Sequence, residues 1–220
     1  MTAERVFAIA KQDDPAALLA ALPAGIAPSG LRDRDGTSLV LFCLYSGLQK
    51  NLAALTARGD ALPLHEAAAL GDAVALERAL ARSPDSLFLL SPNGWTALHL
   101  AAFFGREPTV RLLLTRGADA NLWGRAFEHN LPLHAACAGR TGKPDVVRAL
   151  IPATRDIDAR QGGGWTPLML AAANGMADSA ALLVGAGADR ALANDAGKTA
   201  VALAREHGHA DLAARLSAPA

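Results

Sequence analysis

The chain has 220 residues, 51% of them hydrophobic, with 21 basic and 21 acidic side chains and a formal net charge of zero. This balance provides no electrostatic footprint for nucleic acid or an anionic membrane, so neither is expected as a partner. Charged residues, Gly and Pro interrupt every apolar stretch, and none approaches the roughly 18 residues that suggest a membrane span.

The first 60 residues predict two helical units of unequal length. Residues 1–33 contain the segment Ala10-Lys-Gln-Asp-Asp-Pro-Ala-Ala-Leu-Leu19, which is typical of a turn between two helices. The beginning of the chain lacks the basic and long apolar regions of a signal peptide, so a cytoplasmic location is expected. A weaker unit covers 34–60, and its Leu39 precedes Leu64 by only 25 residues.

Four fuller units and a shorter last unit follow, and they share a signature. The segment Gly94-Trp-Thr-Ala-Leu-His-Leu-Ala-Ala-Phe-Phe-Gly105 recurs in altered form at 130–139 and 164–175. Spacings of 34, 35 and 35 residues separate the anchor leucines Leu64, Leu98, Leu133 and Leu168. The units divide at 61–91, 92–125, 126–160, 161–193 and 194–220.

Each unit predicts two packed helices. Side-chain oxygens of Thr96, Thr166 and Thr199 are placed to cap first helices. Pro132 and Pro167 stand at the first position of a helix, where the missing N–H of proline costs nothing. Paired alanines allow first helices to approach closely, while leucine and valine stripes predict second helices that fill the layer between units. The pairs are Ala101-Ala102, Ala135-Ala136 and Ala171-Ala172.

A period near 33 with this signature resembles the ankyrin repeat. The resemblance covers nearly the whole chain and implies one elongated all-α domain over 1–220, a solenoid of about six to seven helix-turn-helix repeats with short β-turn fingers. Residues 1–33 are then an N-terminal cap, 34–60 a truncated repeat, 61–193 four fuller repeats, and 194–220 a C-terminal cap. The short spacing from Leu39 to Leu64 implies that the finger near 59–62 is missing.

The resemblance also implies a binding face, formed by finger tips and by the positions after the paired alanines. Large aromatic side chains fall at several of these positions, although the chain has only ten aromatic residues, and such residues often dominate interfaces. An alternative is that the phenylalanines pack beneath the neighbouring turn and the tryptophans lie flat on adjacent repeats. The candidate set is Trp95, Phe103, Phe104, Trp123, Asn130, Trp165, Asn174 and Lys198.

The unit at 126–160 is irregular. Gly139-Arg-Thr-Gly142 inserts about three residues between its helices, and Phe127-Glu-His-Asn130 replaces the usual turn. This unit also carries His129, His134 and Cys137, which leave open a small-molecule or metal-responsive role.

Catalytic chemistry is not expected, because no combination of acid, base and nucleophile persists when the residues are mapped onto the repeat. His65, His99 and His134 occupy the signature histidine, whose imidazole normally bonds nearby turn groups. No cofactor is expected. The two cysteines, Cys43 and Cys137, fall in the first helices of repeats about three apart, too far from each other to form a disulfide.

The expected function is therefore non-catalytic binding of a partner protein through the concave face and finger tips. A dedicated inhibitor or stabiliser of one enzyme is the alternative within binding. We expect a monomer with at most weak self-association. Arg outnumbers Lys 17 to 4, a composition that hints at a GC-rich bacterial gene.

Overall fold

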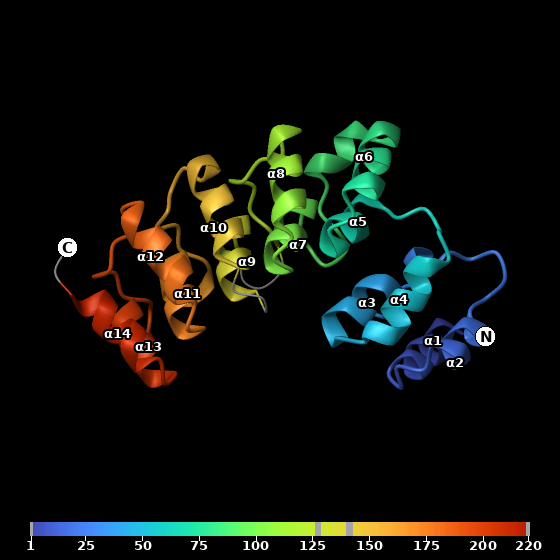
Figure 1. Cartoon of the computed structure of the whole chain (residues 1–220), viewed down its shortest axis with the longest axis horizontal. Helices are drawn as coiled ribbons and strands as arrows, with labels where there is room; N and C mark the ends of the chain where they lie inside the picture. Colours follow the sequence, from blue (N-terminus) through green and yellow to red (C-terminus); the bar gives the residue numbers. More distant parts are fainter. Residues whose placement is uncertain (1, 126–128, 140–142, 219–220) are drawn as a thin grey trace.

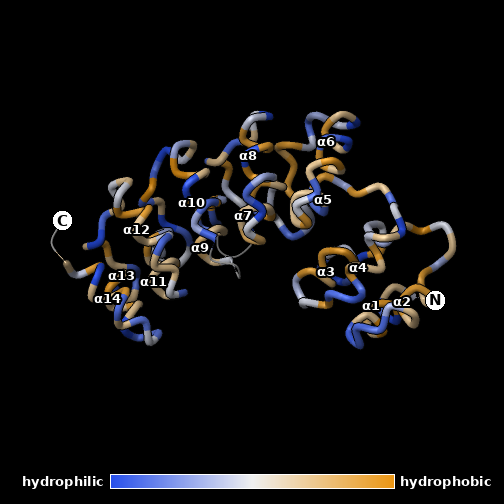
Figure 2. Tube along the Cα trace, viewed as in Figure 1, coloured by the Kyte–Doolittle hydropathy of each residue, from blue (hydrophilic) through white to orange (hydrophobic). Residues whose placement is uncertain are grey.

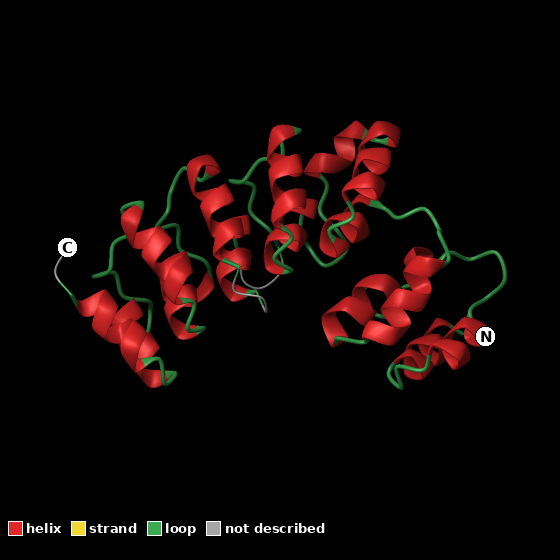
Figure 3. Cartoon of the chain, viewed as in Figure 1, coloured by secondary structure: helices red, strands yellow, loops and turns green. Residues whose placement is uncertain are grey.

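The computed structural model describes residues 2–125, 129–139 and 143–218. These residues form fourteen α-helices, joined in consecutive pairs by loops and without a sheet (Figure 3). The pairs are α1 (Ala3–Ala10) and α2 (Pro15–Ala21), α3 (Leu39–Ser46) and α4 (Gln49–Ala57), α5 (Leu64–Leu70) and α6 (Ala73–Arg82), α7 (Ala97–Phe103) and α8 (Glu107–Thr115), α9 (Pro132–Ala138) and α10 (Pro144–Leu150), α11 (Pro167–Ala173) and α12 (Ala177–Gly185), and α13 (Ala200–Glu206) and α14 (Ala210–Ser217). Short 3₁₀ turns lie at Pro28–Gly30, Pro84–Phe88, Ile151–Ala153 and Gly162–Gly164.

The helical pairs stack side by side into an arch. First helices α5, α7, α9 and α11 lie on its inner side, and second helices α6, α8, α10 and α12 lie on its outer side (Figure 1). From α3 onwards each first helix packs on the next, and helices α6, α8, α10 and α12 pack on one another in the same order. This arrangement confirms the all-α solenoid that the resemblance implies.

Local sequence signals set the helix boundaries. The side chains of Thr96, Thr166 and Thr199 each accept a hydrogen bond from the backbone N–H three residues later, at 3.3 Å. After α8 and α12 the chain turns through Gly117 and Gly187, whose φ values of 90° and 96° suit glycine. The prediction that these three threonines cap first helices is confirmed.

The core runs continuously between the repeats. The paired alanines are buried, and so are the anchor leucines of the signature. Hydrophobic residues cover most of α3, which is buried between α1 and α5, whereas several loops at the helix ends are hydrophilic (Figure 2). Small residues on facing first helices therefore allow the close stacking that buries the larger side chains.

Short fingers precede most of the first helices. Their bases are closed by backbone hydrogen bonds from Asp33 to Thr37, from Ser91 to Trp95, from Gln161 to Trp165 and from Asn194 to Lys198. The finger is missing before α5, as the sequence predicts, because α4 ends at Ala57 and α5 begins at Leu64.

Because that finger is missing, the finger before α3 packs directly on the finger before α7. A hydrogen bond joins the side chains of Thr37 and Asn93, with Nδ2 and Oγ1 3.0 Å apart. A Cβ atom at Gly36, whose φ is 80°, would lie 2.8 Å from Cβ of Pro92. Only glycine fits this approach, since another residue would both clash and strain the backbone.

Two predictions about the unit at 126–160 fall outside the described residues. The insertion at Gly139–Gly142 includes 140–142, and the altered turn at Phe127–Asn130 includes 127 and 128. Among the helices of the described ranges, none is long and apolar enough to cross a membrane.

Candidate protein-binding face

A groove lies between the last two fingers and helix α13. It encloses about 580 Å³, and its walls bring together two of the candidate residues, Trp165 and Lys198. Gly163 and Asp195 contribute the finger tips, and Leu203 of α13 also lines the groove. The fingers place these side chains because their closing hydrogen bonds fix the backbone on either side of each tip.

One side of the groove is charged. The Nζ atom of Lys198 donates hydrogen bonds to both carboxylate oxygens of Glu206, at 2.7 and 2.6 Å. This pairing lowers the pKa of Glu206, chiefly through the hydrogen bond and then through the positive charge. A second pair joins the two fingers, because Nη2 of Arg160, beside the other finger, lies 3.1 Å from Oδ1 of Asp195. Both pairs are partly exposed and are therefore available to exchange with groups of a partner.

The other side of the groove is aromatic. Trp165 is half-buried, and its ring packs against the hydrophobic core. A half-buried tryptophan offers apolar area without further ordering, which suits an anchor at an interface. Asn174, at the end of α11, is exposed, and its Nδ2 donates to the backbone oxygen of Cys137 at 3.0 Å.

Three candidate residues are buried, so the expectation that they are exposed on the face is wrong. Trp95 is 2% exposed, Phe104 is 5% exposed and Asn130 is 3% exposed. Trp95 Nε1 donates to Asn130 Oδ1 at 3.0 Å, and its ring stacks on His99. The tryptophan thus links one finger to the next, as in the alternative that places it flat on the adjacent repeat.

The phenylalanines belong to an aromatic cluster that crosses α5. The ring centroid of Tyr45 in α3 lies 5.1 Å from that of Phe104 and 6.1 Å from that of Phe103. Phe103, which is half-buried, also contacts Trp95 at 5.2 Å. Helix α5 packs on both α3 and α7, and its Ala68 is small and fully buried. Phe103 consequently presents only part of its surface.

Trp123 is the most exposed tryptophan among the candidates. Its side chain is 40% exposed, and its ring is tilted against that of His134 with centroids 6.2 Å apart. Trp123 lies in the connection between α8 and α9. Helices α11 and α12 separate α9 from the groove at α13 along the arch (Figure 1). Trp123 therefore remains a candidate, separate from the groove.

The signature histidines bond turn groups, as predicted. The Nε2 atoms of His65, His99 and His134 lie 3.0, 3.0 and 2.9 Å from the backbone oxygens of Leu89, Asn130 and Ala159. Burial lowers the pKa of all three, to about 4 for His99 and His134. Each imidazole thus ties a first helix to the finger of the following repeat.

Of the three possible ligands in the unit at 126–160, His129 is exposed, whereas His134 and Cys137 are buried. Both ring nitrogens of His134 have partners, since Nδ1 accepts from the backbone N–H of Leu131 at 3.2 Å. Cys137 is fully buried, and burial raises the pKa of its thiol to about 12, so it is a poor metal ligand. No group of three potential metal ligands is found within the described ranges.

The contact between Thr37 and Asn93, and the cluster around Tyr45, were not predicted. Both could have been found from the 25-residue spacing between Leu39 and Leu64, because this short spacing indicates that one finger is missing. With that finger gone, groups from α3 and its finger reach those of α7.

Comparison with known proteins agrees with the repeat architecture. The sequence matches a family model described as ankyrin repeats (3 copies) at residues 9–123, 64–161 and 133–219. The chain is 32% identical over 128 residues to the target of rapamycin complex 2 subunit AVO2 of Saccharomyces cerevisiae, an alignment covering 57% of this chain and 30% of that protein.

Two human proteins are also similar. Protein phosphatase 1 regulatory subunit 27 is 36% identical over 97 residues, which cover 44% of this chain and 60% of the relative. Neurogenic locus notch homolog protein 4 is 42% identical over 98 residues, or 44% of this chain and 5% of the relative. The chain thus spans less than two thirds of each, and these eukaryotic relatives lend no support to a bacterial source.

Proposed function

The chain belongs to the ankyrin repeat family, a family of protein-interaction modules, and on this premise we propose that it is a non-catalytic binding protein whose partner docks in the groove between the last two fingers. Trp165 is the apolar anchor and the Lys198–Glu206 pair is the polar rim. We treat 1–220 as one binding domain, acting as a monomer in the cytoplasm.

The observation that carries this proposal is the composition of the groove. A half-buried aromatic ring beside Leu203 is flanked by exposed ion pairs from two different elements. An apolar centre with a charged rim is the usual anatomy of a protein interface. Of the aromatic candidates, Trp95 and Phe104 are excluded from direct contact by burial, so the groove at Trp165 offers the best remaining anchor.

Affinity capture with paired variants tests this function. Wild type, Trp165→Ala and Lys198→Glu would be used to capture proteins from lysate, and the bound proteins compared by quantitative mass spectrometry. A partner should be held by wild type and lost from both variants. Leu19→Ala, which alters an exposed apolar residue of α2, should retain it.

Lys198→Glu is the more decisive variant. The Lys198 side chain is partly exposed and, among the described residues, pairs only with Glu206, so the loss of this surface ion pair should leave the melting temperature almost unchanged. If a specific partner is recovered equally with wild type and Lys198→Glu, and also with Trp165→Ala, the groove is not the binding site.

A regulator of a single enzyme is the second candidate. It is favoured by the names of two relatives, a subunit of a target of rapamycin complex and a regulatory subunit of a phosphatase. This function would give one complex of defined stoichiometry, in which the activity of the captured enzyme changes as this chain is added. Capture of many unrelated proteins through the same groove would instead indicate a scaffold.

A further inference from the structure

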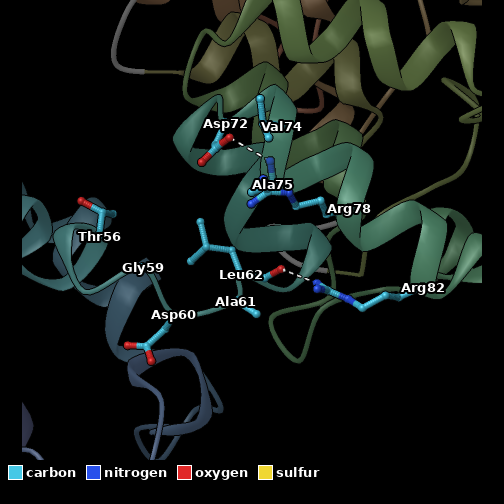
Figure 4. A pocket seen from close by; sticks show the side chains of 10 residues that line it. All are labelled: Thr56, Gly59, Asp60, Ala61, Leu62, Asp72, Val74, Ala75, Arg78 and Arg82. Carbon is cyan, nitrogen blue, oxygen red and sulfur yellow. Dashed lines mark hydrogen bonds between the residues drawn. The ribbon is translucent and has the colours of Figure 1, made fainter.

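The outer layer of second helices is interrupted between α4 and α6. Helices α2 and α4 pack together, as do α6 and α8, α8 and α10, and α10 and α12, but α4 and α6 have no comparable contact. The short connection from α4 to α5 leaves a cavity of about 270 Å³ at this step (Figure 4). The missing finger therefore opens a surface that a regular repeat would cover.

The floor of this cavity is apolar. Leu62 from the connection points towards α6, where Val74 and Ala75 form the facing wall (Figure 4). Val74 is 61% exposed, the largest exposed fraction among the big hydrophobic side chains of the described residues. Covering Leu62 and Val74 with an apolar side chain would remove this surface from water.

The acidic residues of the cavity are engaged within the chain. Asp60 Oδ2 lies 2.7 Å from Arg58 Nε. Asp72 caps α6 by accepting a hydrogen bond from the backbone N–H of Ala75 at 2.9 Å. Neither carboxylate is therefore positioned to neutralise the cationic residues that line the same cavity.

Those cationic residues are Arg78 and Arg82, one turn apart on α6. Within the described residues neither forms an ion pair, and Arg82 is held only through Nη2, 3.3 Å from the backbone oxygen of Leu62 (Figure 4). A guanidinium has five N–H donors, so most of them remain available. Carboxylates are the groups that such planar donors bind best in a protein partner.

We propose that this cavity is a second docking site, which binds an acidic segment of a partner protein. An apolar side chain of the segment covers Leu62 and Val74, while its neighbouring carboxylates pair with Arg78 and Arg82. The site lies on the outer side of the arch and is separate from the groove at Trp165, so the two can be occupied together.

Fluorescence polarisation with the full chain tests the proposal. The probe is a fluorescein-labelled peptide of alternating Glu and Leu residues, and a peptide of alternating Lys and Leu is the control ligand. The test variants are Arg78→Gln with Arg82→Gln, and Val74→Ser. The matched control, Arg5→Gln with Arg205→Gln, removes the same charge from exposed arginines elsewhere.

The acidic peptide should bind wild type saturably. Each test variant should lower the affinity for this peptide by about fivefold or more, whereas the affinity of the matched control should stay within about twofold of wild type. Binding should also weaken as salt rises, because the pairing charges are exposed. Trp165→Ala should leave this affinity unchanged, so failure here is distinguishable from failure of the groove.

Three results would overturn the proposal: no saturable binding of the acidic peptide, equal binding by the test variants, or equal binding of the Lys–Leu peptide. Light scattering adds a fourth. If wild type forms a dimer that the double arginine variant does not, a second copy of the chain occupies the cavity instead. Because Val74 is largely exposed, Val74→Ser should fold normally even if the loss of Arg82 weakens the α4–α5 connection.

Discussion

Thr37 and Asn93, 56 residues apart, join their side chains by a hydrogen bond of 3.0 Å between the fingers before α3 and α7. In a regular array each finger contacts the finger of the adjacent repeat. Here the repeat formed by α5 and α6, which lies between the two fingers, has no finger of its own. The contact therefore bridges two steps of the arch and links the N-terminal helices to the regular repeats.

A double-mutant cycle would measure this link. Thr37→Val and Asn93→Ala each remove one partner of the bond, and we expect a coupling free energy of about 0.5–1.5 kcal/mol in urea unfolding. The reason is that the two buried or half-buried groups would otherwise lose a partner without regaining water. Additive effects of the two substitutions would mean that the fingers do not depend on one another.

The fold was largely predictable because its signals are local and repeated. Caps such as Thr96, the paired alanines and the leucine period each act within one or two repeats, so reading the sequence recovers them. Burial on the inner face was not predictable in the same way. The exposure of each tryptophan depends on the finger of the following repeat. Asn130 covers Trp95, whereas the finger at 194–198 leaves Trp165 half-buried at the wall of the groove.

Close packing of first helices predicts that Ala102→Leu is destabilising. Ala102 is 2% exposed between neighbouring first helices, and a larger side chain must displace them, at a cost of about 1–3 kcal/mol. Urea unfolding measures the change. Ala138→Leu, at the exposed end of α9, is the control and should stay within about 0.5 kcal/mol of wild type. An unchanged midpoint for Ala102→Leu would argue against tight stacking at this step.

Glu66 is a buried acid in the first turn of α5, 2% exposed. Burial raises its pKa, although the Ser38 hydroxyl and Arg32 oppose the rise. A raised pKa means that folding favours the protonated form, so its stabilising contribution is present below the ordinary pKa of 4.5 and is lost as pH rises through the folded value. At neutral pH the chain therefore bears the cost of burying a charge.

Glu66→Gln should accordingly raise the melting temperature near neutral pH and change it little near pH 4, with a shift of about 2–4 °C for each kcal/mol gained. Thermal unfolding at the two pH values measures the difference. Glu77→Gln, which alters a partly exposed acid paired with Arg116, should not show the same pH dependence. A lower melting temperature for Glu66→Gln at neutral pH would indicate that the ionised carboxylate is stabilised by Ser38 and Arg32.

Acid should destabilise the fold through His134. Its Nδ1 accepts a hydrogen bond from the N–H of Leu131, and its Nε2 donates to the oxygen of Ala159. Protonation of Nδ1 would place its new N–H against the N–H of Leu131 and break this bond. Burial also disfavours the charged imidazole and lowers the pKa of His134 from 6.5 to about 4. Because the folded pKa is depressed, the stabilisation is complete above about pH 6.5 and is lost as pH falls towards 4.

Urea unfolding at several pH values between 7 and 4 would show this loss. His134→Gln should be less stable than wild type at neutral pH, since glutamine cannot reproduce both hydrogen bonds, but it should lose less stability on acidification. His207→Gln alters an exposed histidine and should follow wild type throughout. If His134→Gln and wild type lose stability in parallel, then His134 does not titrate in this range, and the acid sensitivity must come from other groups such as His99, whose pKa is also about 4.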